Sequence, residues 1–201
     1  MDTRTTNSLT TMLQRAAATA LLLAAVGAGA QDGAGEPAKP AGHGVTTIPA
    51  LDVPRYMGPW FEIAKFPNRF QAKCVADTSA RYALRPDGRV EVVNRCRLAD
   101  GQIEEAVGVA RQVGETSSPK LQVRFAPRWL SWLPFVWGDY WVLDLDDAYQ
   151  LAAVGDPARE YLWILSRTPA VDPAAFEALM QRLRRQGFDM DRLERTVQNA
   201  P

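Results

Sequence analysis

The chain has 201 residues, 47% of them hydrophobic, and its 23 basic and 23 acidic side chains cancel. This balance fits one globular domain with a tail and argues against a nucleic-acid-binding protein with a basic face. Two cysteines and one histidine cannot supply the four ligands of a structural zinc site, so we expect no metal. A Ser-His-Asp or Cys-His enzyme would have to use His43.

Residues 1–30 are typical of a secretory signal. Two arginines precede an apolar run over residues 16–26, and small residues lead up to Ala30, which predicts cleavage after that residue. The alternative, a membrane span, needs about 20 apolar residues, more than this run supplies. Gln31 stands where a lipoprotein would have a cysteine. We therefore expect export to the periplasm without a lipid anchor, with association with the outer membrane left open.

Residues 31–50 are rich in Gly, Pro and Ala and predict a flexible linker, which leaves residues 51–201 as the folded domain. His43 lies in this linker, so we do not expect catalysis by histidine. In an oxidising compartment Cys74 and Cys96 are expected to form a disulfide bond. Two independent buried thiols are the alternative.

The segment between residues 57 and 166 predicts an all-β fold. Short stretches of alternating polar and apolar residues are separated by turn residues such as Pro86-Asp87-Gly88. Eight such strands joined by short turns favour an antiparallel up-and-down β-barrel, because closure removes both sheet edges. The predicted strands cover residues 58–66, 75–84, 89–96, 103–112, 120–125, 139–145, 149–154 and 161–166.

The pattern then changes to the helical period. Asp172 is a predicted N-cap, followed by Pro173 at the first helical position, and Gly187 is expected to end the helix. The apolar residues at helical spacing predict packing against the outside of the barrel; they are Phe176, Leu179, Met180 and Leu183. Residues 193–198 are expected to add a final strand.

Several stretches resemble one known family. Gly58-Pro59-Trp60 matches the Gly-x-Trp signature of the lipocalins, and Arg167, directly after the last predicted strand, matches their third signature. Asp146 fits only part of the second. Residues 55–70 and 161–169 resemble more specifically the bacterial lipocalins of the Blc type, with plant temperature-induced lipocalins and apolipoprotein D as more distant relatives.

This resemblance implies structural roles for the signature residues. In the family the tryptophan that corresponds to Trp60 closes the barrel floor, and the arginine that corresponds to Arg167 lies across its face. We therefore expect Gly58, Trp60 and Arg167 to serve the fold. With the floor at Trp60, the loops after the odd-numbered strands surround an open mouth. Cys74 and Cys96 would then join neighbouring strands at that mouth.

Alternation within the strands predicts the cavity wall. With Gln122 and Arg124 facing water, Leu121, Val123 and Phe125 point inward. In the predicted strand 139–145, an outward Asp144 places Trp141 and Leu143 inside. An outward Arg81 places Ala80 and Tyr82 inside. The resemblance to lipocalins also implies that Trp163 lies in the cavity and Trp137 at its rim. The ligand-binding residues expected on these grounds are Tyr82, Leu121, Val123, Phe125, Trp137, Trp141, Leu143 and Trp163.

The segment 127–141 contains four of the six tryptophans. It connects the fifth and sixth predicted strands and is expected at the mouth. One interpretation is a hydrophobic lid folded over the cavity; the other is an exposed patch, residues 127–138, that contacts a membrane surface.

The main functional hypothesis is an exported carrier that is not an enzyme and needs no cofactor. Its partner is a lipid or another apolar small molecule and not a nucleic acid, and the resemblance implies fatty acids or lysophospholipids in transport, storage or membrane maintenance. One alternative is an enzyme that uses a cavity carboxylate or an unpaired Cys74. Another is a docking module that uses residues 129–137. Both monomer and homodimer are compatible with the sequence.

Overall fold

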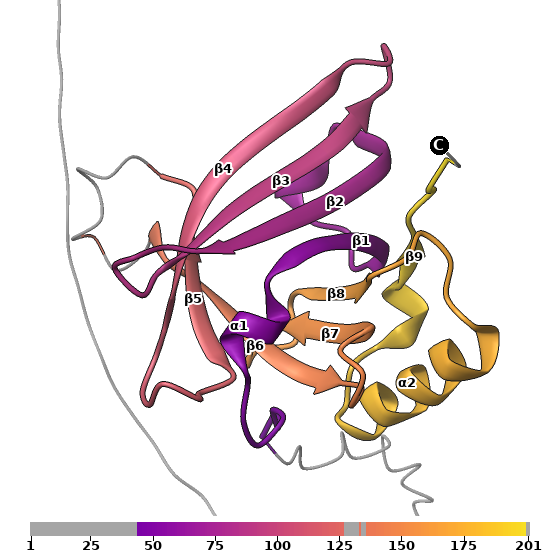
Figure 1. Cartoon of the computed structure of the whole chain (residues 1–201). Coiled ribbons are helices and arrows are strands. Elements are labelled where there is room, and N and C mark those ends of the chain that lie inside the picture. The colour runs from indigo at the N-terminus through magenta and orange to yellow at the C-terminus, as the bar shows by residue number, and fades with distance from the viewer. Residues whose placement is uncertain (1–43, 127–132, 134–135, 200–201) are drawn as a thin grey trace, which may run out of the picture. The chain divides into compact units, whose positions relative to one another are not determined.

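The computed structural model describes residues 44–126, 133 and 136–199. Within them one antiparallel sheet runs in the order β2-β3-β4-β5-β6-β7-β8-β1-β9, and pairing of β1 with β2 closes the ring (Figure 1). The predicted eight-stranded barrel is confirmed. Its strands are β1 (Gly58–Lys65), β2 (Cys74–Leu84), β3 (Val90–Leu98), β4 (Ile103–Gln112), β5 (Lys120–Arg124), β6 (Gly138–Leu145), β7 (Leu151–Gly155) and β8 (Leu162–Ser166).

Helix α2 (Pro173–Arg185) packs on the outside of the barrel, as predicted. The Asp172 carboxylate accepts a hydrogen bond from the Ala175 amide at 2.8 Å and caps the helix. Leu179, Met180 and Leu183 are buried in one cluster with residues of β1, β6, β7 and β8. The remaining short elements are α1 (Val53–Tyr56), the 3-10 helices η1 (Arg69–Gln71) and η4 (Met190–Arg192), and strand β9 (Glu194–Arg195).

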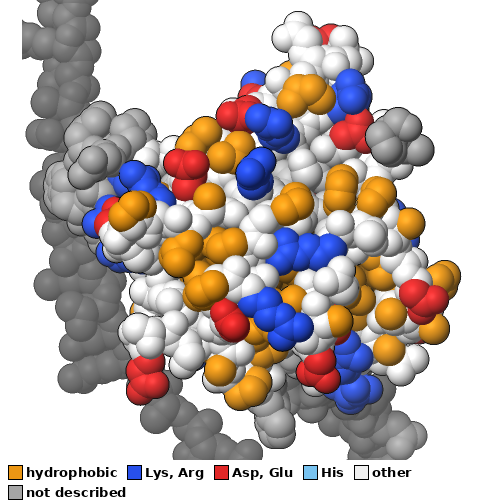
Figure 2. Space-filling model, viewed as in Figure 1, with side chains coloured by type: hydrophobic (Ala, Val, Ile, Leu, Met, Phe, Trp, Pro, Cys, Tyr) orange, Lys and Arg blue, Asp and Glu red, His pale blue; other side chains and the backbone are white. Residues whose placement is uncertain are grey.

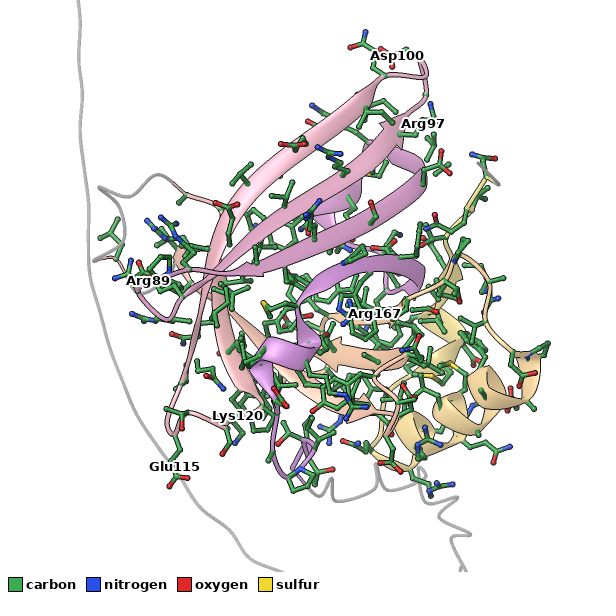
Figure 3. All side chains as sticks on the ribbon, in the orientation of Figure 1. Arg89, Arg97, Asp100, Glu115, Lys120 and Arg167 are labelled. Carbon is green, nitrogen blue, oxygen red and sulfur yellow. A yellow bond between two sulfur atoms is a disulfide. The ribbon has the colours of Figure 1, made fainter. Side chains whose placement is uncertain are left out.

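The barrel floor is built around Trp60, which is fully buried. The Arg167 side chain is labelled in Figure 3. Its guanidinium lies 3.9 Å from the centre of the indole and donates hydrogen bonds to the carbonyl oxygens of Pro59, Arg55 and Tyr56. A Cβ at Gly58, where φ is +98°, would lie 3.3 Å from this guanidinium. The signature residues therefore pack on one another and join α1 to the first and last strands of the barrel.

Residues 44–50 correct one sequence prediction, because they pack on the barrel instead of belonging to a flexible linker. The Ile48 amide donates to the Val142 carbonyl at 3.1 Å, and the Thr46 amide donates to Gln186 Oε1 at 3.1 Å. Val45 and Ile48 pack against the two core clusters. Two apolar side chains in a Gly/Pro/Ala-rich stretch are enough to anchor its end.

The predicted signal and the first part of the predicted linker, including His43, lie outside the residues that the structure describes. In the part it does describe, no helix is both long and apolar enough to span a membrane.

The C-terminal segment completes the barrel wall where β1 and β2 separate. Their pairing extends only to Phe61 and Ser79. Beyond that point β9 pairs with β1, and the Gln198 side chain donates to the carbonyl oxygens of Glu62 and Thr78 at 2.7 and 2.8 Å. The final strand expected over residues 193–198 is therefore a two-residue strand that continues as a hydrogen-bonded tail.

The stack on Trp60 predicts the effect of replacing Arg167. We expect Arg167→Ala to lower the free energy of unfolding by about 1–3 kcal/mol, because it removes a cation–π contact and hydrogen bonds to three floor carbonyls. Urea denaturation of the two proteins measures this. Arg69→Ala, which removes an exposed arginine of η1, is the control and should unfold like the wild type. Equal stability of Arg167→Ala and wild type would contradict the structural role.

Candidate ligand-binding site

The barrel encloses a cavity of about 450 Å³ that is lined mainly by apolar side chains. Its floor is formed by Leu51, Val53 and Tyr56, next to Trp60. Its mouth is formed by residues that follow β1, β5 and β7, three of the four loops expected to surround it. A cavity closed at one end, with few polar groups, suits a small hydrophobic ligand.

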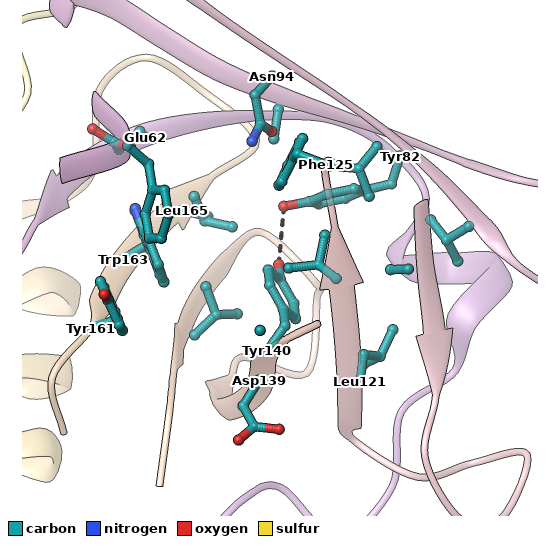
Figure 4. Close-up of a pocket in the computed structure, with 18 of the residues that line it drawn as sticks. Glu62, Tyr82, Asn94, Leu121, Phe125, Asp139, Tyr140, Tyr161, Trp163 and Leu165 are labelled. Atoms are coloured by element: carbon teal, nitrogen blue, oxygen red, sulfur yellow. Dashed lines mark hydrogen bonds between the residues drawn. The ribbon is translucent and has the colours of Figure 1, made fainter. Parts of the chain in front are cut away.

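Six of the eight predicted ligand-binding residues line this cavity (Figure 4). Their contact with a ligand stays a prediction, but their place on the wall agrees with the strand phases for four of them and with the family resemblance for Trp137 and Trp163. They are Tyr82 on β2, Leu121 and Val123 on β5, Phe125 directly after β5, Trp137 before β6, and Trp163 on β8.

The predicted phase of β6 is wrong, so Trp141 and Leu143 do not line the cavity. Both pack in the outer cluster beneath α2. The pairing of β6 with β7 shifts between Val142 and Asp144, which makes Leu143 the extra residue of a β-bulge. The bulge puts Leu143 and Asp144 on the same outer face, where the Asp144 carboxylate accepts two hydrogen bonds from Arg182 of α2. Strict alternation from Asp144 ignores this extra residue and therefore assigned Trp141 and Leu143 to the inner face.

Sequence reasoning missed Tyr140, which the bulge turns into the cavity. Its hydroxyl lies 2.9 Å from the Tyr56 hydroxyl. It also lies 3.0 Å from the Tyr82 hydroxyl, a contact drawn as a dashed line in Figure 4. We call these three residues the tyrosine cluster. Burial raises the pKa of all three hydroxyls, for Tyr82 to about 12, so each is protonated at neutral pH. No sequence signal links residues 56, 82 and 140, because only the barrel brings them together.

A second polar group lies on the mouth side, around Glu62 of β1. The Trp163 indole donates to Gln71 Oε1 at 2.8 Å, and the Gln71 amide donates to the Glu62 carboxyl at 2.5 Å. Thr196 donates to the other carboxyl oxygen at 2.6 Å. Burial raises the pKa of Glu62 above its usual 4.5, against the opposing effect of these hydrogen bonds. The network fixes Trp163 and joins η1 to the C-terminal tail.

Arg124 is buried, whereas the sequence predicts that it faces water. Its guanidinium lies 5.1 Å from the centre of the Trp137 ring, and that of Arg111 lies 4.1 Å from the same ring. Because Leu121 and Val123 line the cavity, Arg124 is on the outer face, as the phase of β5 predicts. Trp137 therefore lines the cavity and also contacts two arginines of the outer face, across the rim of the barrel.

The tryptophan-rich segment is only partly described. Residues 127–132 and 134–135 lie outside the described ranges, so the choice between a lid and a membrane-contacting patch stays a prediction.

The two cysteines form the predicted disulfide bond, with Cα atoms 5.6 Å apart and no free cysteine left. This removes the enzyme hypothesis that depends on an unpaired Cys74. In the residues that can be described, no three His, Cys, Asp or Glu side chains gather as metal ligands.

Comparison with known proteins adds a family relationship. A model of the lipocalin-like domain matches residues 51–198. Temperature-induced lipocalin-1 of Arabidopsis thaliana is 42% identical over 154 residues, which cover 76% of this chain and 82% of that protein. The outer membrane lipoprotein Blc of Escherichia coli (strain K12) is 36% identical over 151 residues, which cover 75% and 81%. Insecticyanin of the tobacco hornworm Manduca sexta shares the fold, with a TM-score of 0.59 at 20% identity over 76% of this chain and 83% of that one.

The buried Glu62 carboxyl predicts a pH-dependent stability. Its pKa is raised in the folded state, so the folded chain binds the proton more tightly than the unfolded chain. The resulting stabilisation is complete below about pH 4.5 and is lost as the pH rises through the raised pKa. We expect Glu62→Gln, which stays uncharged, to lack this loss. Urea denaturation at a series of pH values measures the difference between the two proteins.

The exposed carboxyl of Glu104 on β4 provides the control for this experiment. We expect Glu104→Gln to follow the wild-type profile between pH 4.5 and 8. A Glu62→Gln profile parallel to that of the wild type would contradict the assigned role of Glu62.

Proposed function

The chain belongs to the lipocalin family, whose members bind small hydrophobic ligands, and on this premise we propose that it is an exported carrier of fatty acids or lysophospholipids. The observation that supports this proposal is the apolar cavity of about 450 Å³, closed by Trp60 at one end and reached through the mouth at the other. Burial of an acyl chain there contributes about 25 cal/mol per Å² of apolar surface removed from water.

Binding without catalysis agrees with the chemistry of the polar groups in the cavity. The Glu62 carboxyl is occupied by hydrogen bonds from Gln71 and Thr196. Both cysteines are used in the disulfide bond. We therefore propose a carrier and not an enzyme.

We propose that the carrier acts in the cell envelope, in lipid transport, storage or membrane maintenance. The Escherichia coli relative, Blc, is an outer membrane lipoprotein. Here Gln31 follows the predicted cleavage site, so release into the periplasm without a lipid anchor is the proposed fate. Acidic and basic side chains are interspersed on the face shown in Figure 2, which does not present the basic field that nucleic acid requires.

Two tryptophans on opposite faces of the barrel wall provide a matched test of binding. Trp163 lines the cavity, whereas Trp141 lies in the outer cluster with its ring 4.3 Å from Lys120 Nζ. We expect Trp163→Phe to raise the Kd for oleic acid by about tenfold, equivalent to roughly 1.4 kcal/mol of lost contact and lost positioning by Gln71. Isothermal titration calorimetry measures the Kd without depending on tryptophan fluorescence.

Trp141→Phe is the control and should bind oleic acid within about twofold of the wild type. Equal losses in the two variants would show that Trp163 has no special contact with the ligand. Absence of binding by the wild-type protein to both oleic acid and an oleoyl lysophospholipid at micromolar concentration would refute the proposed function.

The proposed export predicts a defined mature chain. When the full-length gene is expressed in a Gram-negative host, the periplasmic fraction should contain protein that begins at Gln31, as measured by intact mass spectrometry. Replacing residues 16–26 by a polar segment should retain the full-length chain in the cytoplasm. A periplasmic chain that keeps residues 1–30, or a wild-type chain found only in the cytoplasm, would contradict this prediction.

A further inference from the structure

The tyrosine cluster has one more hydrogen to donate than its own hydrogen bonds use. Three phenol hydroxyls carry three hydrogens, and two hydrogen bonds connect them, through Tyr140. Whichever hydroxyl donates to which, one hydrogen stays unused within the cluster. In the ranges that the structure describes, the three oxygens have no other hydrogen-bond partner. Because an unsatisfied buried donor is costly, this hydrogen requires an acceptor.

The position of the cluster offers this hydrogen to whatever fills the cavity, which is water in the free protein and a ligand in the complex. All three tyrosines line the cavity, and Tyr56 belongs to α1 at the floor, in contact with Trp60. The neighbouring wall is formed by apolar residues such as Leu51, Val53 and Leu121. A molecule that fills this end of the cavity thus meets hydrocarbon on its sides and a hydroxyl donor at its tip.

One positive charge near the floor also favours an electron-rich group there. The Arg167 guanidinium lies behind Trp60 and donates to the Tyr56 carbonyl, and its charge acts to lower the pKa of Tyr56 and Tyr82 against the larger effect of burial. Of the charged side chains that line the cavity, Arg69 and Asp156 lie at the mouth, Glu62 hydrogen-bonds to η1, and Asp139 directly precedes Tyr140. A protonated hydroxyl donates to a charged or an uncharged oxygen, so either kind of acceptor suits the tyrosine cluster.

We propose that the tyrosine cluster binds the carbonyl or carboxyl oxygen of a long-chain ligand, which enters polar end first and leaves its hydrocarbon end toward the mouth. This inference rests on the proposed function and narrows it. A free fatty acid has a small polar end that suits the floor, whereas the head group of a lysophospholipid is much larger. Fatty acids, or other chains that end in a small oxo group, are thus the ligand class.

Orientation can be measured with spin-labelled stearic acids. We expect 5-doxyl-stearic acid, labelled near the carboxyl, to broaden the methyl NMR signals of Leu51 and Val53 at the floor. The 16-doxyl isomer, labelled near the hydrocarbon end, should broaden those of Val136 at the mouth. The reverse pattern would overturn the inference and leave the proposed function intact. Absence of binding by either isomer and by oleic acid would instead refute the proposed function.

A triple variant, Tyr56→Phe, Tyr82→Phe and Tyr140→Phe, tests the donor itself. Replacing every partner by phenylalanine removes all three hydroxyls without leaving one unsatisfied, so the fold should be kept. We expect its Kd for oleic acid to rise about threefold to tenfold, with no rise for an oleoyl lysophospholipid. Tyr149→Phe removes a hydroxyl that accepts a hydrogen bond from the Asp52 amide outside the cavity, and this control should bind oleic acid like the wild type.

An unchanged Kd of the triple variant for oleic acid would overturn the inference, since it would mean that the cluster donates to no ligand oxygen. An equal loss for oleic acid and the lysophospholipid would also overturn it, because a selective hydrogen bond would not be involved. Circular dichroism and thermal unfolding confirm that the variant compared is folded.

Discussion

The contact between Arg167 and Trp60 is the interaction on which the rest of the structure depends. The guanidinium covers the indole at 3.9 Å and hydrogen-bonds to carbonyl oxygens of α1 and of the first residues of β1. It holds α1 across the end of the barrel, so the apolar interior is closed there and open only at the mouth. A barrel without this floor would be a channel exposed to water at both ends, in which burial of a hydrocarbon chain would stabilise a complex far less.

The cavity combines apolar walls with two separate polar groups. At the floor the tyrosine cluster presents protonated hydroxyls, while near the mouth Glu62, Gln71 and Trp163 are joined by hydrogen bonds to one another. The second network shapes the entrance and ties the C-terminal tail to the gap between β1 and β2. The first network places hydroxyl donors at the closed end, among apolar side chains, which is why we assign the polar end of the ligand to the floor.

Much of this fold could be predicted from the sequence, because alternation along a strand and helical spacing in α2 are local properties. The signature residues Gly58, Trp60 and Arg167 also identified the floor. The β-bulge at Leu143 could not be predicted, since an extra residue in a strand follows from pairing with β7 and not from its own composition. The error placed Trp141 and Leu143 inside and hid Tyr140. The tyrosine cluster and the anchoring of residues 44–50 depend in the same way on contacts between distant segments.

The most direct test of the account is to identify what the folded protein carries when it is purified without detergent. Mass spectrometry of an organic extract of that protein measures this, with an extract of the Arg167→Ala variant for comparison. The account predicts a long-chain lipid with a small oxygen-bearing end, recovered in a ratio approaching one per chain from the wild-type protein. Recovery of no lipid, from a barrel that also fails to take up added oleic acid, would contradict it.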